Sequence, residues 1–176
     1  MERLGTFPNA RAKALSDIRM LLTRIQTIAA VEIDEVAKGI DVLKRLRAET
    51  YEDLNQIQHE YMILCAAQWL IDQHRCPSDT IWFWNPRQTG GADEPDLRGE
   101  RGGTAIVSAE ITTSTEPKGM IDSRMRKTLG KLSKMAGQKF YFTASPAMCQ
   151  RAQTKIGKDG WHIEAVSLAA VTKDVL

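Results

Sequence analysis

Residues 90–114 read GGADEPDLRGERGGTAIVSAEITTS, and this stretch decides the fold that we expect for the chain. Two strand-like runs, PDLRGE and TAIVSAEITTS, flank Gly102 and Gly103. Extended runs joined by a glycine-containing turn are typical of an antiparallel hairpin. Five carboxylates crowd the same stretch: Asp93, Glu94, Asp96, Glu100 and Glu110. Like charges at this density repel unless solvent, cations of a partner or a divalent metal lie between them.

On the N-terminal side of the hairpin, the sequence has a helical period. Residues 10–48 place apolar side chains at steps of three and four, with one slip in the middle. The spacing favours an intramolecular hairpin and a dimer seam about equally. Thr50 with Asp53 forms a plausible capping box for a second helix, 51–74, with a largely apolar middle. The apolar seam of the first region consists of Leu15, Ile18, Leu22, Ile25, Ala29, Ile33, Val36, Ile40 and Leu43.

On the C-terminal side, helices and strands alternate. Residues 80–86 and the two runs of the hairpin predict three strands, followed by a helix over 120–137, a strand, a helix opened by Ser145 and Pro146, and a closing strand over 161–171. This order predicts an α/β (α+β) fold, a mixed sheet flanked by helices. We expect residues 1–49 to form an N-terminal helical segment and residues 50–176 to form the α/β domain.

The charge of the chain is unevenly distributed. The 176 residues carry a formal charge of +2, but residues 118–158 contain ten basic residues and one acid, so this segment is +9 and the remainder is −7. Solvated helix faces usually mix the two signs, so the excess predicts a polyanionic partner such as DNA, with a generally basic surface as the alternative. The basic residues expected at such an interface are Lys118, Arg124, Lys127, Lys131, Lys134 and Lys139.

Cysteine usage and hydropathy indicate a cytoplasmic protein. The three cysteines are odd in number and scattered, a pattern typical of a reducing compartment rather than a disulfide framework. The sequence contains no CxxC pair, so it does not predict a zinc site. No apolar run reaches the length of a membrane span, and the first residues lack the apolar core of a signal peptide.

Two of the acids predict a metal site. Asp96 lies in the first strand of the hairpin, directly after a proline, and Glu110 lies near the end of the second, with thirteen residues between them. A hairpin can bring both carboxylates to one end of the sheet. Together with the backbone carbonyl of Ile111, they would form a hard oxygen site suited to Mg²⁺ or Mn²⁺. A metal held there can activate water for attack on a phosphate.

The sequence "PD" at 95–96, the strand ending "AEIT" at 109–112 and the following basic helix and strand resemble the PD-(D/E)xK nuclease superfamily, over about residues 50–168. The resemblance implies a restriction-endonuclease-like fold and a metal-dependent DNA endonuclease, with Asp96 and Glu110 as metal ligands. It also points to Glu60 on the preceding helix as a further acidic ligand, with a solvated glutamate as the alternative. One position departs from the pattern: Thr112 stands where the superfamily has lysine.

That lysine would position or deprotonate the attacking water and offset developing negative charge. Threonine can orient a water but supplies no charge. A lysine of the following helix, Lys127 or Lys131, or less directly Lys118, could take over the role. The alternative is a nuclease-like domain without catalysis.

The leading hypothesis is therefore a Mg²⁺-dependent endodeoxyribonuclease, with a restriction or phage-defence setting as one option, acting as a homodimer or with a partner subunit. The alternatives are a catalytically inactive DNA-binding or assembly module, and a helical dimerisation protein. Trp82 and Trp84 share one face of a strand; we expect them in the core rather than stacked on bases. His59, His74 and His162 lie in unrelated contexts and indicate no catalytic arrangement.

Overall fold

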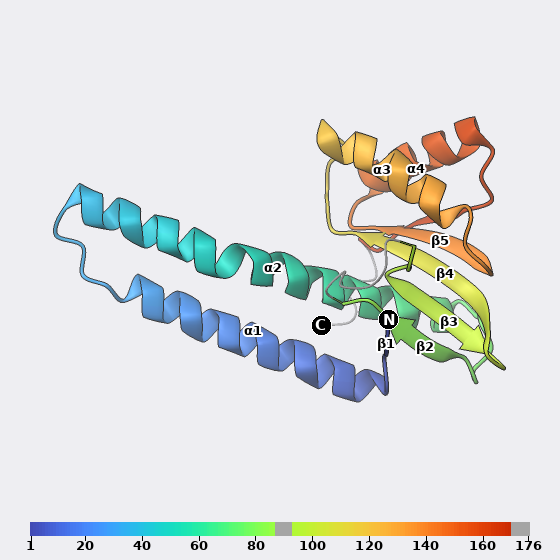
Figure 1. The fold of residues 1–176 in the computed structure, drawn as a ribbon, viewed down its shortest axis with the longest axis horizontal. Coiled ribbons are helices and arrows are strands. Elements are labelled where there is room, and N and C mark those ends of the chain that lie inside the picture. Colours follow the sequence, from blue (N-terminus) through green and yellow to red (C-terminus); the bar gives the residue numbers. More distant parts are fainter. Residues whose placement is uncertain (87–92, 170–176) are drawn as a thin grey trace.

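A computed structural model describes residues 1–86 and 93–169 of the chain. The helices are α1 (Phe7–Ala29), α2 (Val36–Asp72), α3 (Met120–Leu132) and α4 (Pro146–Asp159). The strands are β1 (Glu2–Arg3), β2 (Ile81–Trp84), β3 (Leu97–Arg101), β4 (Thr104–Thr112), β5 (Gln138–Thr143) and β6 (Glu164–Ser167). Figure 1 shows an α/β body from which α1 and most of α2 extend as a two-helix arm.

The described strands form one open sheet in chain order, β1 to β6. The pairs from β1 to β4 are antiparallel, whereas β4, β5 and β6 are parallel. The predicted hairpin is confirmed: β3 and β4 pair from Arg101↔Thr104 inward. Its turn is Gly102 and Gly103, both with positive φ (58° and 77°), a conformation that favours glycine. The α/β architecture and the order of elements expected from the sequence are thus observed, apart from the short β1. The end of the closing strand, residues 170–171, lies outside the described residues.

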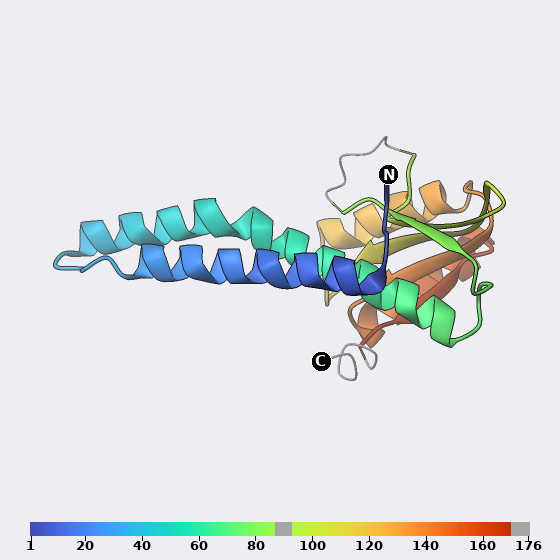
Figure 2. The same cartoon turned by 90° about the horizontal axis from the view of Figure 1, so that it is seen from below.

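Helices cover both faces of the sheet, and each face has its own apolar cluster (Figure 2). The C-terminal half of α2 packs through Ile63, Ala67 and Leu70 against Val107, Ala109, Phe140 and other side chains of one face. Helices α3 and α4 cover the opposite face. The cluster there comprises Met125, Leu129, Leu132, Tyr141, Met148, Ala152, Ile156 and Ile163.

The tryptophan side chains of β2 belong to the core. Trp82 and Trp84 are both buried in the cluster under α2. The expectation that they contribute to the core is confirmed, and they offer no exposed surface for stacking on bases. Phe83, on the other face of the strand, contacts the guanidinium of Arg98 instead.

Helix α2 continues through the position where the sequence predicted a helix start. The Thr50 hydroxyl donates to the carbonyl of Leu46, 2.7 Å away, as threonine does inside a helix, so the capping box at Thr50 is wrong. The chain turns instead at residues 30–35, between α1 and α2. The expected domain boundary at 49/50 therefore falls in the middle of one helix. No helix of residues 1–86 and 93–169 combines the length and the apolar character that a membrane crossing requires.

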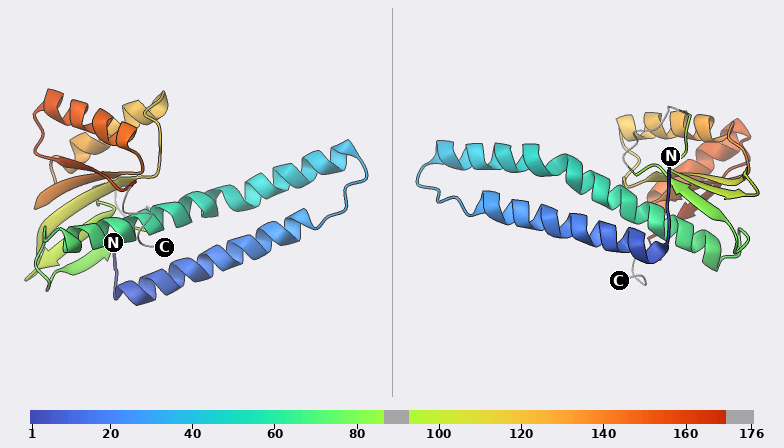
Figure 3. Two further views of the ribbon diagram at one scale, coloured as in Figure 1. Left: turned by 180° about the vertical axis from the view of Figure 1, so that it is seen from behind. Right: turned by 60° about the horizontal axis from the view of Figure 1, so that its bottom comes forward.

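Helix α2 runs back along α1, so the two helices form an intramolecular hairpin (Figure 3). The buried side chains of α1 are Ala10, Ala14, Leu21 and Ile28. The stripe predicted as a seam is a different one, since Leu15, Ile18 and Leu22 are exposed. The hairpin alternative is observed, but it is closed by side chains beside the predicted seam.

Two ion pairs join the helices of the arm on one side. Lys13 Nζ lies 2.9 Å from Glu60 Oε2, and Arg24 NH1 lies 2.6 Å from Asp53 Oδ2. Glu60 is buried, with 1% of its surface exposed, and the Lys13 ammonium also lies above the Trp84 ring. A buried carboxylate needs such a cation, because its desolvation is otherwise uncompensated.

We therefore expect Lys13→Ala to lower the free energy of unfolding by about 1–3 kcal/mol, the cost of leaving a buried charged group without its partner. Urea unfolding at neutral pH measures this difference. The exposed pair Lys38–Asp34 supplies the control, because Lys38→Ala should change the free energy of unfolding little. Equal effects of the two substitutions would show that Glu60 does not depend on Lys13.

Candidate metal and catalytic site

The β3–β4 hairpin brings the two predicted acids together. Its register includes Leu97↔Ala109, and one further antiparallel step places Asp96 opposite Glu110. Both side chains are buried, with 5% and 6% of their surfaces exposed. The backbone N–H of Ile111 donates to Asp96 Oδ2 over 2.8 Å, which fixes the Asp96 carboxylate against β4.

The Glu110 carboxylate lies in an unfavourable environment for a negative charge. Burial raises the pKa of Glu110 above its usual range, and the charge of Asp96 raises it further, while Lys131 and His59 act in the opposite direction. Two buried carboxylates at adjacent positions therefore need a nearby cation in order to remain ionised together.

Lys131 of α3 supplies one such cation. Its Nζ forms a close ion pair with Glu110 Oε1 at 2.5 Å and also donates to the backbone carbonyl of Glu94 at 3.1 Å. A lysine of the helix after β4 thus reaches the acidic pair, whereas Thr112 stands at the lysine position of the motif. Lys127, one helical turn earlier, is exposed, and among the described residues it forms no ion pair with Glu110.

His59 of α2 is the second positive neighbour. Its Nε2 lies 3.3 Å from Asp96 Oδ2, an ion-pair distance without the alignment of a good hydrogen bond. Burial lowers the pKa of His59, but the adjacent Asp96 carboxylate outweighs that effect, so the pKa lies above its usual value. Sequence reasoning assigned His59 no role. A sequence pattern that could have identified His59 is a polar stripe at helical spacing, and this stripe lines the site. It consists of Glu52, Asn55, Gln56 and His59.

Glu60, by contrast, points away from the acidic pair. It is bound to Lys13 of α1 and borders a hollow between the helices of the arm. Successive residues of a helix are rotated by about 100°, so only one of His59 and Glu60 can face the site. The residue of α2 beside Asp96 is therefore His59, and the metal role expected for Glu60 has no support in its position.

The acidic pair lines a cleft of about 440 Å³ between α2, the end of β4 and α3. Thr112 and Tyr141 also line it, and Ser114 N–H donates to Thr112 Oγ1 at 3.4 Å. Burial strongly raises the pKa of Tyr141, so its phenol stays neutral. The remaining polar lining is Glu52, Asn55, Gln56, Thr113, Ser114, Arg124, Lys127 and Thr128.

The other acids of residues 90–114 do not enter this cleft. Glu94 pairs with the N-terminal ammonium of Met1 at 3.0 Å, and Glu100 pairs with Arg98 at 2.8 Å. Asp93 is exposed. Of the five carboxylates that are close in sequence, Glu94 and Glu100 thus have cations of their own. Only Asp96 and Glu110 form a buried pair.

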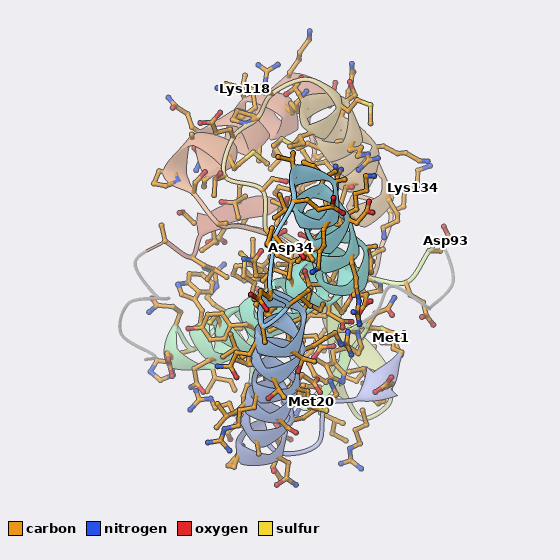
Figure 4. The ribbon with its side chains drawn as sticks, turned by 90° about the vertical axis from the view of Figure 1, so that its left-hand side faces the viewer. Met1, Met20, Asp34, Asp93, Lys118 and Lys134 are labelled. Carbon is orange, nitrogen blue, oxygen red and sulfur yellow. The ribbon has the colours of Figure 1, made fainter. Side chains whose placement is uncertain are left out.

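A larger groove of about 1130 Å³ adjoins the cleft, and both are lined by Lys127 and Thr128 of α3. Lys131 and Lys134 also line the groove, as does Asp93. In Figure 4, Lys134 and Asp93 lie on the same side of the molecule, whereas Lys118 lies at its upper end. Of the expected DNA-binding residues, Arg124, Lys127, Lys131 and Lys134 line one or both hollows.

Two expected contacts lie elsewhere. Lys118 pairs with Glu116, and Lys139 donates to the carbonyl of Gly137 at 3.3 Å. Neither residue lines the cleft or the groove.

The donor atoms of the site suit magnesium better than a transition metal. Within residues 1–86 and 93–169, no group of three or more histidines, cysteines, aspartates and glutamates is arranged to hold a metal ion. Magnesium, however, commonly uses one or two protein carboxylates and completes its shell with water and substrate phosphate. The buried Asp96–Glu110 pair fits that requirement. The Ile111 carbonyl remains a predicted additional ligand.

Comparisons of the chain with protein-family models, with curated proteins and with solved structures found no match. A function for this chain is therefore inferred from the residues and the geometry of the site.

A second set of ion pairs holds α3, and hence Lys131, against α4. Asp122 of α3 binds Arg151 at 2.7 Å and Lys155 at 3.1 Å, and Arg126 binds Asp159 at 2.9 Å. The hydrogen bonds from Arg151 and Lys155 lower the pKa of Asp122 well below its usual range. Part of the +9 segment thus forms ion pairs that join two helices.

We expect Asp122→Asn to destabilise the fold in a pH-dependent manner. Because the folded-state pKa is depressed, the contribution of Asp122 is complete above about pH 4 and is lost as the pH falls below that value. Urea unfolding should separate the wild type from the variant at pH 7, and the difference should shrink at about pH 2–3. For comparison, Asp79→Asn removes an exposed pair with Arg101 and should change stability little at either pH. A pH-independent effect of Asp122→Asn would contradict the ion-pair assignment.

Proposed function

We propose that the protein is a metal-dependent endonuclease that hydrolyses phosphodiester bonds in DNA. One observation carries the proposal: the buried carboxylates of Asp96 and Glu110 lie side by side at a cleft, and Glu110 is paired with the ammonium of Lys131, which lines the adjoining basic groove. The mixed sheet with helices on both faces is compatible with the restriction-endonuclease-like fold that the sequence resembles. A restriction or defence setting agrees with such an activity.

Asp96 and Glu110 are the residues that would hold Mg²⁺ or Mn²⁺, together with the carbonyl of Ile111. The ion would supply positive charge at the scissile phosphate and acidify a bound water. Burial of both carboxylates excludes competing solvent and limits their motion. His59 and the Ile111 N–H position Asp96, so that its carboxylate is oriented before substrate arrives.

Lys131 is the best candidate for the charge that Thr112 lacks. Its ammonium already lies at the acidic pair, and its hydrogen bond to the Glu94 carbonyl holds the side chain in place. In that position it can stabilise negative charge on the phosphate or assist deprotonation of the attacking water. Thr112, which lines the same cleft, can orient that water through its hydroxyl.

DNA would approach along α3. Arg124 and Lys127 line the cleft, and Lys127, Lys131 and Lys134 continue into the groove. Among the described residues, Arg124, Lys127 and Lys134 form no ion pair with a carboxylate, so their charges are free to contact phosphates. Binding through such contacts weakens steeply with salt, because each neutralised phosphate releases counterions.

Nicking of supercoiled plasmid, with Mg²⁺ or Mn²⁺ and with EDTA, tests the proposal directly. We expect cleavage only with metal, and we expect Asp96→Asn and Glu110→Gln to abolish it while DNA affinity at low salt persists, because uncharged amides hold a divalent cation poorly. Calorimetric titration with Mn²⁺ should show the same loss of metal binding. Glu116→Gln, which removes an exposed acid outside the cleft, is the matched control and should cut normally. Normal cleavage by Asp96→Asn or Glu110→Gln would refute the site.

The role of Lys131 is tested separately. We expect Lys131→Ala to slow cleavage ~10²-fold or more, as the loss of one positioned acid–base or charge-stabilising group usually does. Lys134→Ala, a change of an exposed lysine one turn away, should affect binding and its salt dependence but not the rate at saturating DNA. Single-turnover rates with excess protein distinguish the two effects. If Lys131→Ala cuts at the wild-type rate, Lys131 does not replace the lysine that Thr112 lacks. Lys127, or a metal-bound water oriented by Thr112, would then be the simpler explanation of cleavage.

The contact between Lys131 and Glu110 also favours a second candidate. An ammonium at 2.5 Å already neutralises the carboxylate, so the pair is electrostatically satisfied without metal. A nuclease-like domain that binds DNA without cutting it would retain this arrangement. It would bind DNA in a salt-dependent manner but show neither nicking nor Mn²⁺ binding.

A further inference from the structure

The two-helix arm has two chemically different sides. On one side, basic residues are paired with acids: Lys13 with Glu60, Arg24 with Asp53 and Arg45 with Glu49. This side also carries Met20, which borders a hollow with Arg24 and Asp53. Figure 4 looks along the arm, with Met20 on α1 and Asp34 at the tip.

The opposite side of the arm is apolar. Successive residues of a helix are rotated by about 100°, so the exposed apolar residues named below form one stripe along α1 and one along α2. On each helix, the stripe lies about 100° around the helix axis from the side chains that are buried between the two helices. In an antiparallel pair these rotations place both stripes on the same side. The electrostatic influence of Arg11 of α1 on Tyr61 and Cys65 of α2 agrees with this arrangement. The exposed apolar residues are Leu15, Ile18 and Leu22 on α1 and Val36, Ile40, Leu43, Tyr51 and Leu54 on α2.

Arginines interrupt this apolar side. Arg11 precedes Leu15 by one helical turn, and Arg47 follows Leu43 by one turn, so both lie within the stripes. Both are exposed, and neither pairs with a carboxylate of the described chain. By the same helical spacing, no aspartate or glutamate of α1, or of α2 up to Glu60, falls on this side. The surface therefore combines apolar area with uncompensated positive charge.

We propose that this side of the arm binds an acidic amphipathic helix of a partner protein. A helix laid along the arm between the two stripes would bury Leu15, Leu22, Ile40 and Leu43 and would bring carboxylates to Arg11 and Arg47. The result is a three-helix bundle with the apolar core in the middle. Since α1 has 23 residues and a rise of about 1.5 Å per residue, the face is roughly 34 Å long, enough for about three heptads of partner helix.

The charge pattern distinguishes this occupant from a second copy and from a membrane. A second copy would set arginine against arginine, because it carries no acid on this side. Helices that lie on membranes keep their cations on the polar face, whereas Arg11 and Arg47 lie within the apolar stripes and would be driven into hydrocarbon. An acidic helix satisfies both arginines.

The proposed surface is separate from the nuclease-like site. The side of α2 that lines the cleft carries Glu52, Asn55, Gln56 and His59, and its centre lies about 130° around the helix from the centre of the apolar stripe. A bound helix therefore leaves the cleft open. The inference holds whether or not the protein cuts DNA, and its test does not measure cleavage.

Fluorescence anisotropy with the full chain tests the surface. The probe is a labelled helical peptide of about three heptads, with leucine at the a and d positions and glutamate at e and g. Its control carries lysine in place of each glutamate. We expect the acidic peptide to bind at micromolar concentration and the basic peptide to bind at least ~10-fold more weakly, because like charges then face each other.

Matched substitutions locate the contact. Leu22→Glu and Arg47→Glu should each weaken binding of the acidic peptide ~10-fold or more, whereas Met20→Glu should not change it. Leu22 and Met20 are similarly exposed, at 52% and 58%, and lie on opposite sides of α1. Circular dichroism should show that the three variants retain their helices. Equal binding of the two peptides, binding of neither, or equal loss in Met20→Glu and Leu22→Glu would overturn the proposal.

Two further measurements exclude the other occupants. Light scattering of the full chain should give the mass of one chain; a dimer that Leu22→Glu dissociates would assign the surface to a second copy and overturn the proposal. Vesicles of phosphatidylcholine and phosphatidylglycerol should not bind the wild type. Binding to such vesicles that Leu22→Glu abolishes would assign the surface to a membrane and would likewise overturn it.

Discussion

The placement of two buried carboxylates at adjacent positions of one hairpin is the constraint on which this structure depends. The register of β3 and β4 sets Asp96 beside Glu110, and burial makes their mutual repulsion costly. The chain meets this cost with cations from two other elements, Lys131 of α3 and His59 of α2. The cleft is consequently the point where the sheet, the long helix and the basic helix meet, and it is there that a divalent ion and a phosphate would find matching groups.

Helix α2 links this site to the arm. One end of the helix packs on the sheet and carries His59 toward Asp96, and the next residue, Glu60, binds Lys13 of α1. Arm and site are thus built on a single rigid element. A partner held on the apolar side of the arm would be positioned relative to the cleft without contacting it, which is a geometry suited to recruiting the proposed nuclease to an assembly.

Local rules predicted much of the body correctly. Gly102 and Gly103 specify the hairpin because their positive φ suits the turn, and Ser145 caps α4 by accepting from the Met148 N–H, as its position before Pro146 suggested. The same rules failed at Thr50, because a threonine hydroxyl can bond to the carbonyl four residues earlier as readily as it can cap a helix. They also favoured Glu60 over His59, since residue type alone cannot show which of two neighbours faces the site.

The sequence alone determined the α/β order, the hairpin with its acidic pair, and the excess of positive charge that follows it. These depend on periodicity, glycine conformation and composition, which are local properties of the chain. Tertiary structure decided which acids remain together: Glu94 and Glu100 acquired partners of their own, and Glu110 acquired Lys131. It also decided which apolar stripe of α1 closes the hairpin and which stays exposed. Such choices depend on distances between segments far apart in the chain, which no local pattern encodes.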